Sequence, residues 1–139
     1  MRYMIIVKAT AESEAGVMPD DKLIGEMAGF HEELARAGVL LDASGLQSSS
    51  KGWCINYDGQ KRTVVDGPFA ETKEIIAGYT MIQVKSRDEA MAWTERFPNP
   101  SIDGGLAQIE VRQLFELEDF EPSEAIERFR EMELAHTKS

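Results

Sequence analysis

The chain is organised around one stretch, Val64-Val65-Asp66-Gly67-Pro68-Phe69-Ala70-Glu71-Thr72-Lys73-Glu74. Its two valines favour an extended backbone. Pro68 fixes its own φ and keeps Gly67 out of the helical region, so we expect a strand to end here. Asp66 would then lie at a strand end, where its carboxylate can face a cleft. An aspartate before a glycine also commonly caps a turn with its own side chain, and both interpretations stay open.

The residues before this stretch predict a β-hairpin. Two β-prone segments, Trp53–Tyr57 and Gln60–Val65, flank Asp58-Gly59, a dipeptide typical of tight hairpin turns. With a two-residue turn, Arg62 shares a face with Asp66 and could lie near its carboxylate. A three-residue turn would shift the register and remove that relation.

The N-terminal part predicts a strand followed by an amphipathic helix. Residues 3–8 are apolar on both alternating faces, as in a central strand that is covered on both sides. After a polar loop over residues 10–18, the pair Asp20-Asp21 can cap a helix that ends at Gly38. The apolar stripe of this helix consists of Leu23, Met27, Phe30 and Leu34.

His31 lies at the edge of that stripe, about 40° from Met27 on the helical wheel. We therefore expect it to be half-buried. It is either a structural residue with a hydrogen bond to a neighbour or a proton-transfer group, because imidazole titrates near neutral pH.

Further strands and helices complete an α+β plan. Residues 39–46 predict a strand with Asp42 and Ser44 on one face, and we take both as candidate substrate-binding residues. Residues 78–85 and 107–115 predict two more strands. Helices are expected after the capping box at Ser86 and after Glu121-Pro122-Ser123. The order is βαββαβ with an inserted β-hairpin and a C-terminal helix.

Composition limits the class of protein. A chain of 139 residues is the size of one domain with one core. Its formal net charge of −10 argues against a nucleic-acid partner. Cys54 is the only cysteine, which excludes an internal disulfide and a thiolate zinc site within one chain; we expect it in the core.

The apolar runs are too short for a membrane partner. None approaches the roughly 18 residues of a membrane span, and the N-terminal run lacks the features of a signal peptide. We therefore expect a cytoplasmic protein.

Aromatic residues predict a homodimer. The sheet face that the helices leave bare is expected to carry more aromatic surface than a monomer usually exposes. The residues in question are Tyr3, Trp53, Tyr57, Tyr79 and Phe115. A second copy packed sheet to sheet would cover them; the alternative is that the C-terminal helix folds under the sheet.

The central motif resembles that of a known family. Asp66-Gly67-Pro68-Phe69, with Glu71-Thr72-Lys73-Glu74 and Gly78-Tyr79, is similar to the DGPF group of YCII-related proteins. The resemblance covers residues 1–115 as one domain and leaves residues 116–139 as a helical extension. It implies a ferredoxin-like fold that pairs into a dimeric α/β barrel.

The resemblance also implies site residues. In the wider family a histidine on the first helix and an aspartate near the sheet form a candidate catalytic pair, and some relatives act on muconolactones. The histidine matches His31 and the aspartate matches Asp66, with Asp42 as the other candidate. His31 would transfer a proton while Asp66 orients the imidazole. Arg62 or Lys73 could hold a substrate carboxylate.

Two classes of function stay open. The sequence has no phosphate-binding glycine loop, metal-ligand cluster or nucleophile–base spacing. An enzyme would therefore carry out proton transfer, isomerisation or elimination on a small anionic or lactone-like molecule, without a metal or cofactor. The alternative is a noncatalytic metabolite- or protein-binding accessory module, because DGPF relatives are often encoded beside extracytoplasmic-function sigma factors. RNA binding is a third possibility, which the acidic composition disfavours.

Overall fold

Four antiparallel strands form the main sheet in the computed structural model, which describes residues 1–71 and 74–138. β1 (Arg2–Lys8) pairs with β5 (Ile76–Gln83) on one side and with β6 (Ile109–Gln113) on the other. β2 (Leu40–Gly45) lies beyond β5, giving the order β2-β5-β1-β6. The predicted α+β, ferredoxin-like plan is confirmed.

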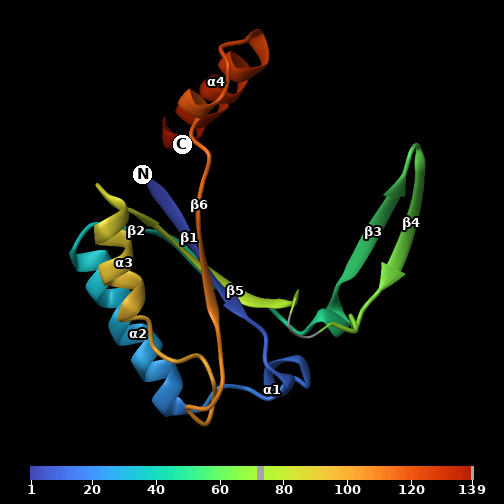
Figure 1. The fold of residues 1–139 in the computed structure, drawn as a ribbon, viewed down its shortest axis with the longest axis vertical. Helices are drawn as coiled ribbons and strands as arrows, with labels where there is room; N and C mark the ends of the chain where they lie inside the picture. Colours follow the sequence, from blue (N-terminus) through green and yellow to red (C-terminus); the bar gives the residue numbers. More distant parts are fainter. Residues whose placement is uncertain (72–73, 139) are drawn as a thin grey trace.

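Two helices, α2 (Asp21–Arg36) and α3 (Arg87–Glu95), lie together along one side of this sheet (Figure 1). α2 begins where the Asp20 carboxylate accepts a hydrogen bond of 2.9 Å from the Leu23 N–H. It ends before Gly38, which has a φ of 75°. Both ends agree with the sequence-based prediction.

The capping box predicted at Ser86 forms only in part. The Ser86 hydroxyl accepts a hydrogen bond from the Glu89 N–H, as expected. The Glu89 carboxylate, however, accepts from the Lys85 N–H instead of the Ser86 N–H. α3 still begins at the expected place.

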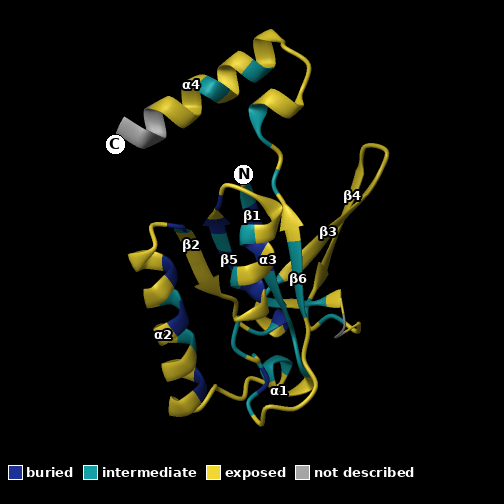
Figure 2. Cartoon of the chain, turned by 60° about the vertical axis from the view of Figure 1, so that its left-hand side comes forward, coloured by how far each residue is buried: buried dark blue, intermediate teal, exposed yellow. Residues whose placement is uncertain are grey.

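The hydrophobic core lies between these helices and the sheet, and Figure 2 shows its buried residues along their facing sides. Ile5, Leu34 and Ile82 are completely buried. Tyr3 belongs to this core, because its register partner is Ile82. The expectation that Tyr3 lies on the bare face is therefore wrong.

The opposite sheet face, called the bare face below, is covered by no helix of the described residues (Figures 1 and 2). By strand alternation it carries Met4 and Ile6, which are half-buried. The expectation that β1 is covered on both sides is thus not met within one chain.

β3 (Trp53–Asp58) and β4 (Lys61–Asp66) form a separate two-stranded sheet that projects from the domain (Figure 1). Gly59, with a φ of 62°, is the first residue of its two-residue turn. The predicted inserted hairpin is confirmed, and of the two turn lengths considered the two-residue turn is the one that forms. Because the hairpin leaves the sheet, Cys54 is exposed and not a core residue.

One predicted loop contains a short helix. α1 (Ala11–Glu14) occupies part of residues 10–18, where only a polar loop was expected. The Thr10 hydroxyl accepts from the Ser13 N–H, and the Ser13 hydroxyl oxygen accepts from the Thr10 N–H. This reciprocal cap starts the helix.

The C-terminal segment leaves the sheet after β6. It passes through a 3-10 turn, η3 (Leu117–Asp119), into α4 (Glu124–Lys138). Figures 1 and 2 both show α4 extending beyond one end of the sheet, so it does not fold under the bare face. Within the described residues, no helix has the length and apolar character needed to cross a membrane.

Candidate functional site

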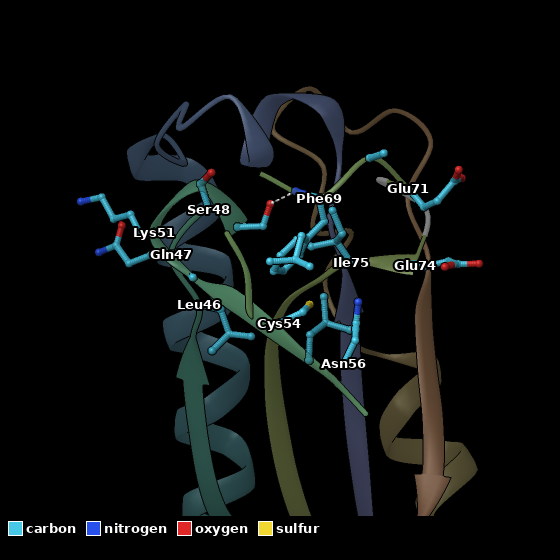
Figure 3. Close-up of a pocket in the computed structure, with 15 residues that line it drawn as sticks. Leu46, Gln47, Ser48, Lys51, Cys54, Asn56, Phe69, Glu71, Glu74 and Ile75 are labelled. Atoms are coloured by element: carbon cyan, nitrogen blue, oxygen red, sulfur yellow. Dashed lines mark hydrogen bonds between the residues drawn. The ribbon is translucent and has the colours of Figure 1, made fainter. Parts of the chain in front are cut away.

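A cleft of about 690 Å³ opens at the base of the hairpin (Figure 3). Small-molecule sites typically measure about 300–1,000 Å³. The hairpin, the Asp66–Phe69 turn and the adjoining ends of β2 and β5 surround it. Its apolar lining residues are Leu46, Val65, Phe69, Ile75 and Ile76.

Strand alternation decides which hairpin residues line the cleft. Cys54 and Asn56 line it together with Val65, which is the register partner of Cys54. Asp66 follows Val65, pairs with Trp53 and therefore lies on the opposite face of the hairpin. The motif aspartate is next to the cleft in sequence but does not line it.

Charged side chains lie at the rim of the cleft. Figure 3 shows Lys51 extending outward on one side and Glu71 and Glu74 on the other. Asn56 lies closer to the centre, and its amide can both donate and accept hydrogen bonds. The lining is thus mainly apolar, and Asn56 joins Gln47, Ser48 and Ser49 as its uncharged hydrogen-bonding residues.

The Asp66–Phe69 turn is fixed to the loop before the hairpin. The Gly67 N–H donates to the Gly52 carbonyl at 2.9 Å, and the Phe69 N–H donates to the Ser49 hydroxyl at 3.0 Å. Ser49 is buried, and both its N–H and its hydroxyl donate to the Glu14 carboxylate. Glu14 of α1 therefore positions Phe69 through Ser49.

The sequence analysis did not identify this Glu14–Ser49 contact. The Thr10–Ser13 cap was the available signal, because it predicts the short helix that carries Glu14. The pairing with Ser49 joins residues 35 positions apart, which no local pattern reveals.

His31 is half-buried, as predicted, between α2 and the sheet. Its Nδ1 lies 2.7 Å from the Met27 carbonyl oxygen, which can only accept, so Nδ1 carries the proton. In the neutral imidazole, Nε2 therefore accepts from the Thr80 hydroxyl at 2.8 Å. The rings of Phe30 and Phe97 contact the imidazole edge to face.

The structure does not bring His31 and Asp66 together. His31 contacts Thr80, which shares the helix-covered face of the main sheet with Ile5. Asp66 ends a strand of the separate hairpin sheet and is exposed there. The two were expected to meet because the family resemblance implies a histidine of the first helix paired with an aspartate near the sheet.

Asp42 and Ser44 share one face of β2, as expected, and the structure shows that it is the bare face. The Tyr79 hydroxyl donates to the Asp42 carboxylate at 2.9 Å, and Tyr79 is the register partner of Ser44. By alternation, Leu46 continues the same face and lines the cleft. The sequence pointed to Tyr79 through its aromatic surface and its place in the motif, but not to its contact with Asp42.

Of the two residues predicted to hold a substrate carboxylate, the structure describes Arg62. Arg62 stacks on Tyr57, with its guanidinium carbon 5.0 Å from the ring centroid. It is four residues from Asp66 along one strand, about 13 Å, so it does not lie near that carboxylate. Lys73 lies outside the described residues.

Metal-ligating side chains do not gather in the part of the chain that the structure describes. No group of three or more His, Cys, Asp or Glu residues there is arranged to hold an ion. The cleft itself offers apolar groups, two amides, two hydroxyls and a thiol, with one ammonium and two carboxylates at its rim.

Comparison with known proteins identifies the family. A sequence model of the YCII-related domain matches residues 1–116. The chain belongs to the YCII-related family. Another protein similar to this one is the uncharacterized protein R00369 of Rhizobium meliloti (strain 1021), which is 25% identical over 96 residues, or 69% of this chain and 77% of that protein.

Similarity to this YCII-related protein is also found among solved structures. One such structure is 5-chloro-2-hydroxyhydroquinone dehydrochlorinase (TftG) from Burkholderia phenoliruptrix AC1100, in complex with 2,5-dihydroxybenzoquinone. The TM-score is 0.46 at 14% identity, over 83% of this chain and 94% of that one. A similarity this low says nothing about what the present chain binds.

Proposed function

We propose that this YCII-related protein binds a small, uncharged and mainly apolar molecule in the cleft at the base of the hairpin. The observation that carries the proposal is the cleft itself, about 690 Å³ with apolar side chains on several sides. Asn56 is the group that would orient a carbonyl or hydroxyl of the ligand.

Charge narrows the class of ligand. Two carboxylates, Glu71 and Glu74, and one ammonium, Lys51, belong to the described lining of the cleft. An excess of negative charge disfavours an anion. Of the two ligand classes expected from the sequence, the proposal therefore keeps the lactone-like molecule in preference to the carboxylate.

For the chemistry, we propose proton transfer without a cofactor, as in isomerisation or elimination. Asp42 and Tyr79 would supply a hydrogen-bonded acid–base pair on the bare face. Neither residue lines the cleft, so the ligand would extend from the cleft along the bare face to reach them. His31 then has a structural role, since both of its ring nitrogens are bonded within the helix–sheet layer.

A thermal-shift screen against small lactones and their ring-opened acids tests the binding site. We expect lactones to raise the melting temperature of the parent and to lose this effect in Asn56→Ala and Phe69→Ala. Thr63→Ala is the matched control. Thr63 is the cross-strand register partner of Asn56 and shares its face of the hairpin, but it does not line the cleft. If lactones still stabilise both cleft variants, the proposal is contradicted. If the stabilisation is lost only in His31→Ala, the ligand binds at His31 instead.

Turnover of a bound lactone, followed by NMR, tests the chemistry. Loss of turnover with retained binding in Tyr79→Phe and Asp42→Asn would support the acid–base pair. Binding without turnover in the parent would instead support the noncatalytic accessory module.

We also propose that the protein is a cytoplasmic homodimer, in which bare faces pack together as in a dimeric α/β barrel. Half-buried apolar side chains in the centre of the bare face support this, namely Met4, Ile6, Tyr79 and Met81. Light scattering at micromolar concentration tests it, and a monomer would contradict it.

A further inference from the structure

The hairpin carries an apolar surface that the described residues leave exposed. Trp53, Ile55, Tyr57 and Val64 lie on the face opposite the cleft, here called the hairpin face. Their exposed fractions are 64%, 42%, 65% and 63%. An isolated two-stranded hairpin is marginally stable in water, so packing against another surface would stabilise this one.

α4 carries a second such surface. Ile126, Phe129 and Met132 recur every three residues, lie on one side of the helix and are here called the helix stripe. Phe129 and Met132 are 54% and 56% exposed. A lone helix of about 15 residues is also marginal in water.

The two segments differ in charge. The hairpin, residues 53–66, contains two basic and two acidic residues, whereas residues 116–133 contain eight acidic residues and two basic ones. Lys61 and Arg62 lie at the tip of the hairpin and form none of the ion pairs found among the described residues. On α4, Arg130 is already bound to Glu118 and Glu127.

The two surfaces do not meet within one chain. Figures 1 and 2 both show the hairpin and α4 projecting from the domain as separate arms. A second copy related by a two-fold axis can present its helix stripe to the hairpin face and receive the reciprocal contact. One symmetric arrangement thus covers both surfaces twice.

We propose that the occupant of the hairpin face is the helix stripe of a second copy of this chain. The basic tip of the hairpin then faces the acidic C-terminal segment of the partner. Because Cys54, Asn56 and Val65 line the cleft from the other side of the same hairpin, the exchange also holds one wall of the cleft in place. It requires neither the proposed ligand nor contact between bare faces.

Cross-linking between two differently substituted copies tests the exchange. In a Cys54→Ser background, one copy carries Tyr57→Cys and an isotopically labelled copy carries Phe129→Cys. After mixing and subunit exchange, a short bismaleimide is expected to join labelled to unlabelled chains. In the matched control the labelled copy carries Glu32→Cys, on the exposed side of α2, and keeps Phe129.

Two further variants separate this contact from other dimers. We expect Ile55→Asp, and truncation after residue 120, each to raise the dimer dissociation constant about tenfold or more. Circular dichroism checks that the domain stays folded. Mixed cross-links no more frequent than in the Glu32→Cys control would overturn the proposal, as would a monomeric parent. A dimer that withstands both variants would also overturn it and leave the bare faces as the interface, whatever the result of the ligand screen.

Discussion

Gly67 packs directly against the backbone of Ser49. A Cβ atom built on Gly67 would lie 1.8 Å from the Ser49 carbonyl oxygen, far inside van der Waals contact. The neighbouring hydrogen bond from the Gly67 N–H to the Gly52 carbonyl keeps the two segments at this distance. The glycine of the motif is thus required by space, because a backbone atom cannot move aside as a flexible side chain would.

Gly67→Ala is expected to lower the free energy of unfolding by about 1–3 kcal/mol through this overlap. Urea denaturation measures the change. Gly29→Ala is the control, since Gly29 lies within α2 with no atom near its missing Cβ. That variant should be more stable than the parent by about 0.5–1 kcal/mol. Equal stability of Gly67→Ala and the parent would contradict the close packing.

Thr80→Val is expected to lower the free energy of unfolding by about 1–3 kcal/mol, because it leaves the Nε2 of His31 without its partner. The imidazole ¹⁵N chemical shifts of His31 should change in the same variant. Asp66→Asn should leave both the stability and these shifts unchanged, since Asp66 is exposed on the hairpin. A response of the His31 shifts to Asp66→Asn would restore the predicted pair.

Local patterns predicted the elements that depend on near neighbours in sequence. Asp20 caps α2, Gly38 ends it, and Gly59 turns the hairpin, each through contacts within a few residues. The half-burial of His31 followed equally from its place on the helical wheel. Alternation in β5 could have added Thr80, because Thr80 and Ile82 share a face.

Nonlocal pairing produced the errors. β5 pairs with β1 and β2 and not with the hairpin, so β3 and β4 leave the sheet and take Asp66, Trp53 and Cys54 with them. The apolar surplus that was assigned to the bare face lies largely on the hairpin for the same reason. The residue propensities of the hairpin do not indicate whether another strand pairs with it, or which one.

Glu110→Gln is expected to destabilise the protein at neutral pH but not in acid. The hydrogen bond from Arg112, and then that from Lys8, hold the pKa of Glu110 below its usual range. Because the folded pKa is lowered, the stabilisation is present above the usual glutamate value of about 4.3 and is lost as the pH falls through the folded value. Urea midpoints at pH 7 and pH 3 measure the difference.

The matched control for this pH effect is Glu95→Gln, at the exposed end of α3. Its difference from the parent should not follow the same pH course. Added salt should also reduce the effect of Glu110→Gln, because the ion pairs are partly solvated. A destabilisation that is equal at both pH values would show that Glu110 acts through packing alone.

Alkylation of Cys54 is expected to compete with ligand binding in the cleft. Cys54 is exposed, lines the cleft and is the only cysteine in the sequence, so N-ethylmaleimide modifies one known position. The adduct would occupy part of the cleft and remove the stabilisation by any lactone found in the screen. Conversely, that lactone should slow alkylation, which intact-mass measurements over time record.

The opposite face of the hairpin provides the control for this protection. In Cys54→Ser with Tyr57→Cys, the thiol lies three residues further along the same strand and faces away from the cleft. Its alkylation rate should not change with the lactone. Protection of both positions would mean that the ligand acts on the hairpin as a whole or on assembly, whereas protection of Cys54 alone places the ligand on the cleft side.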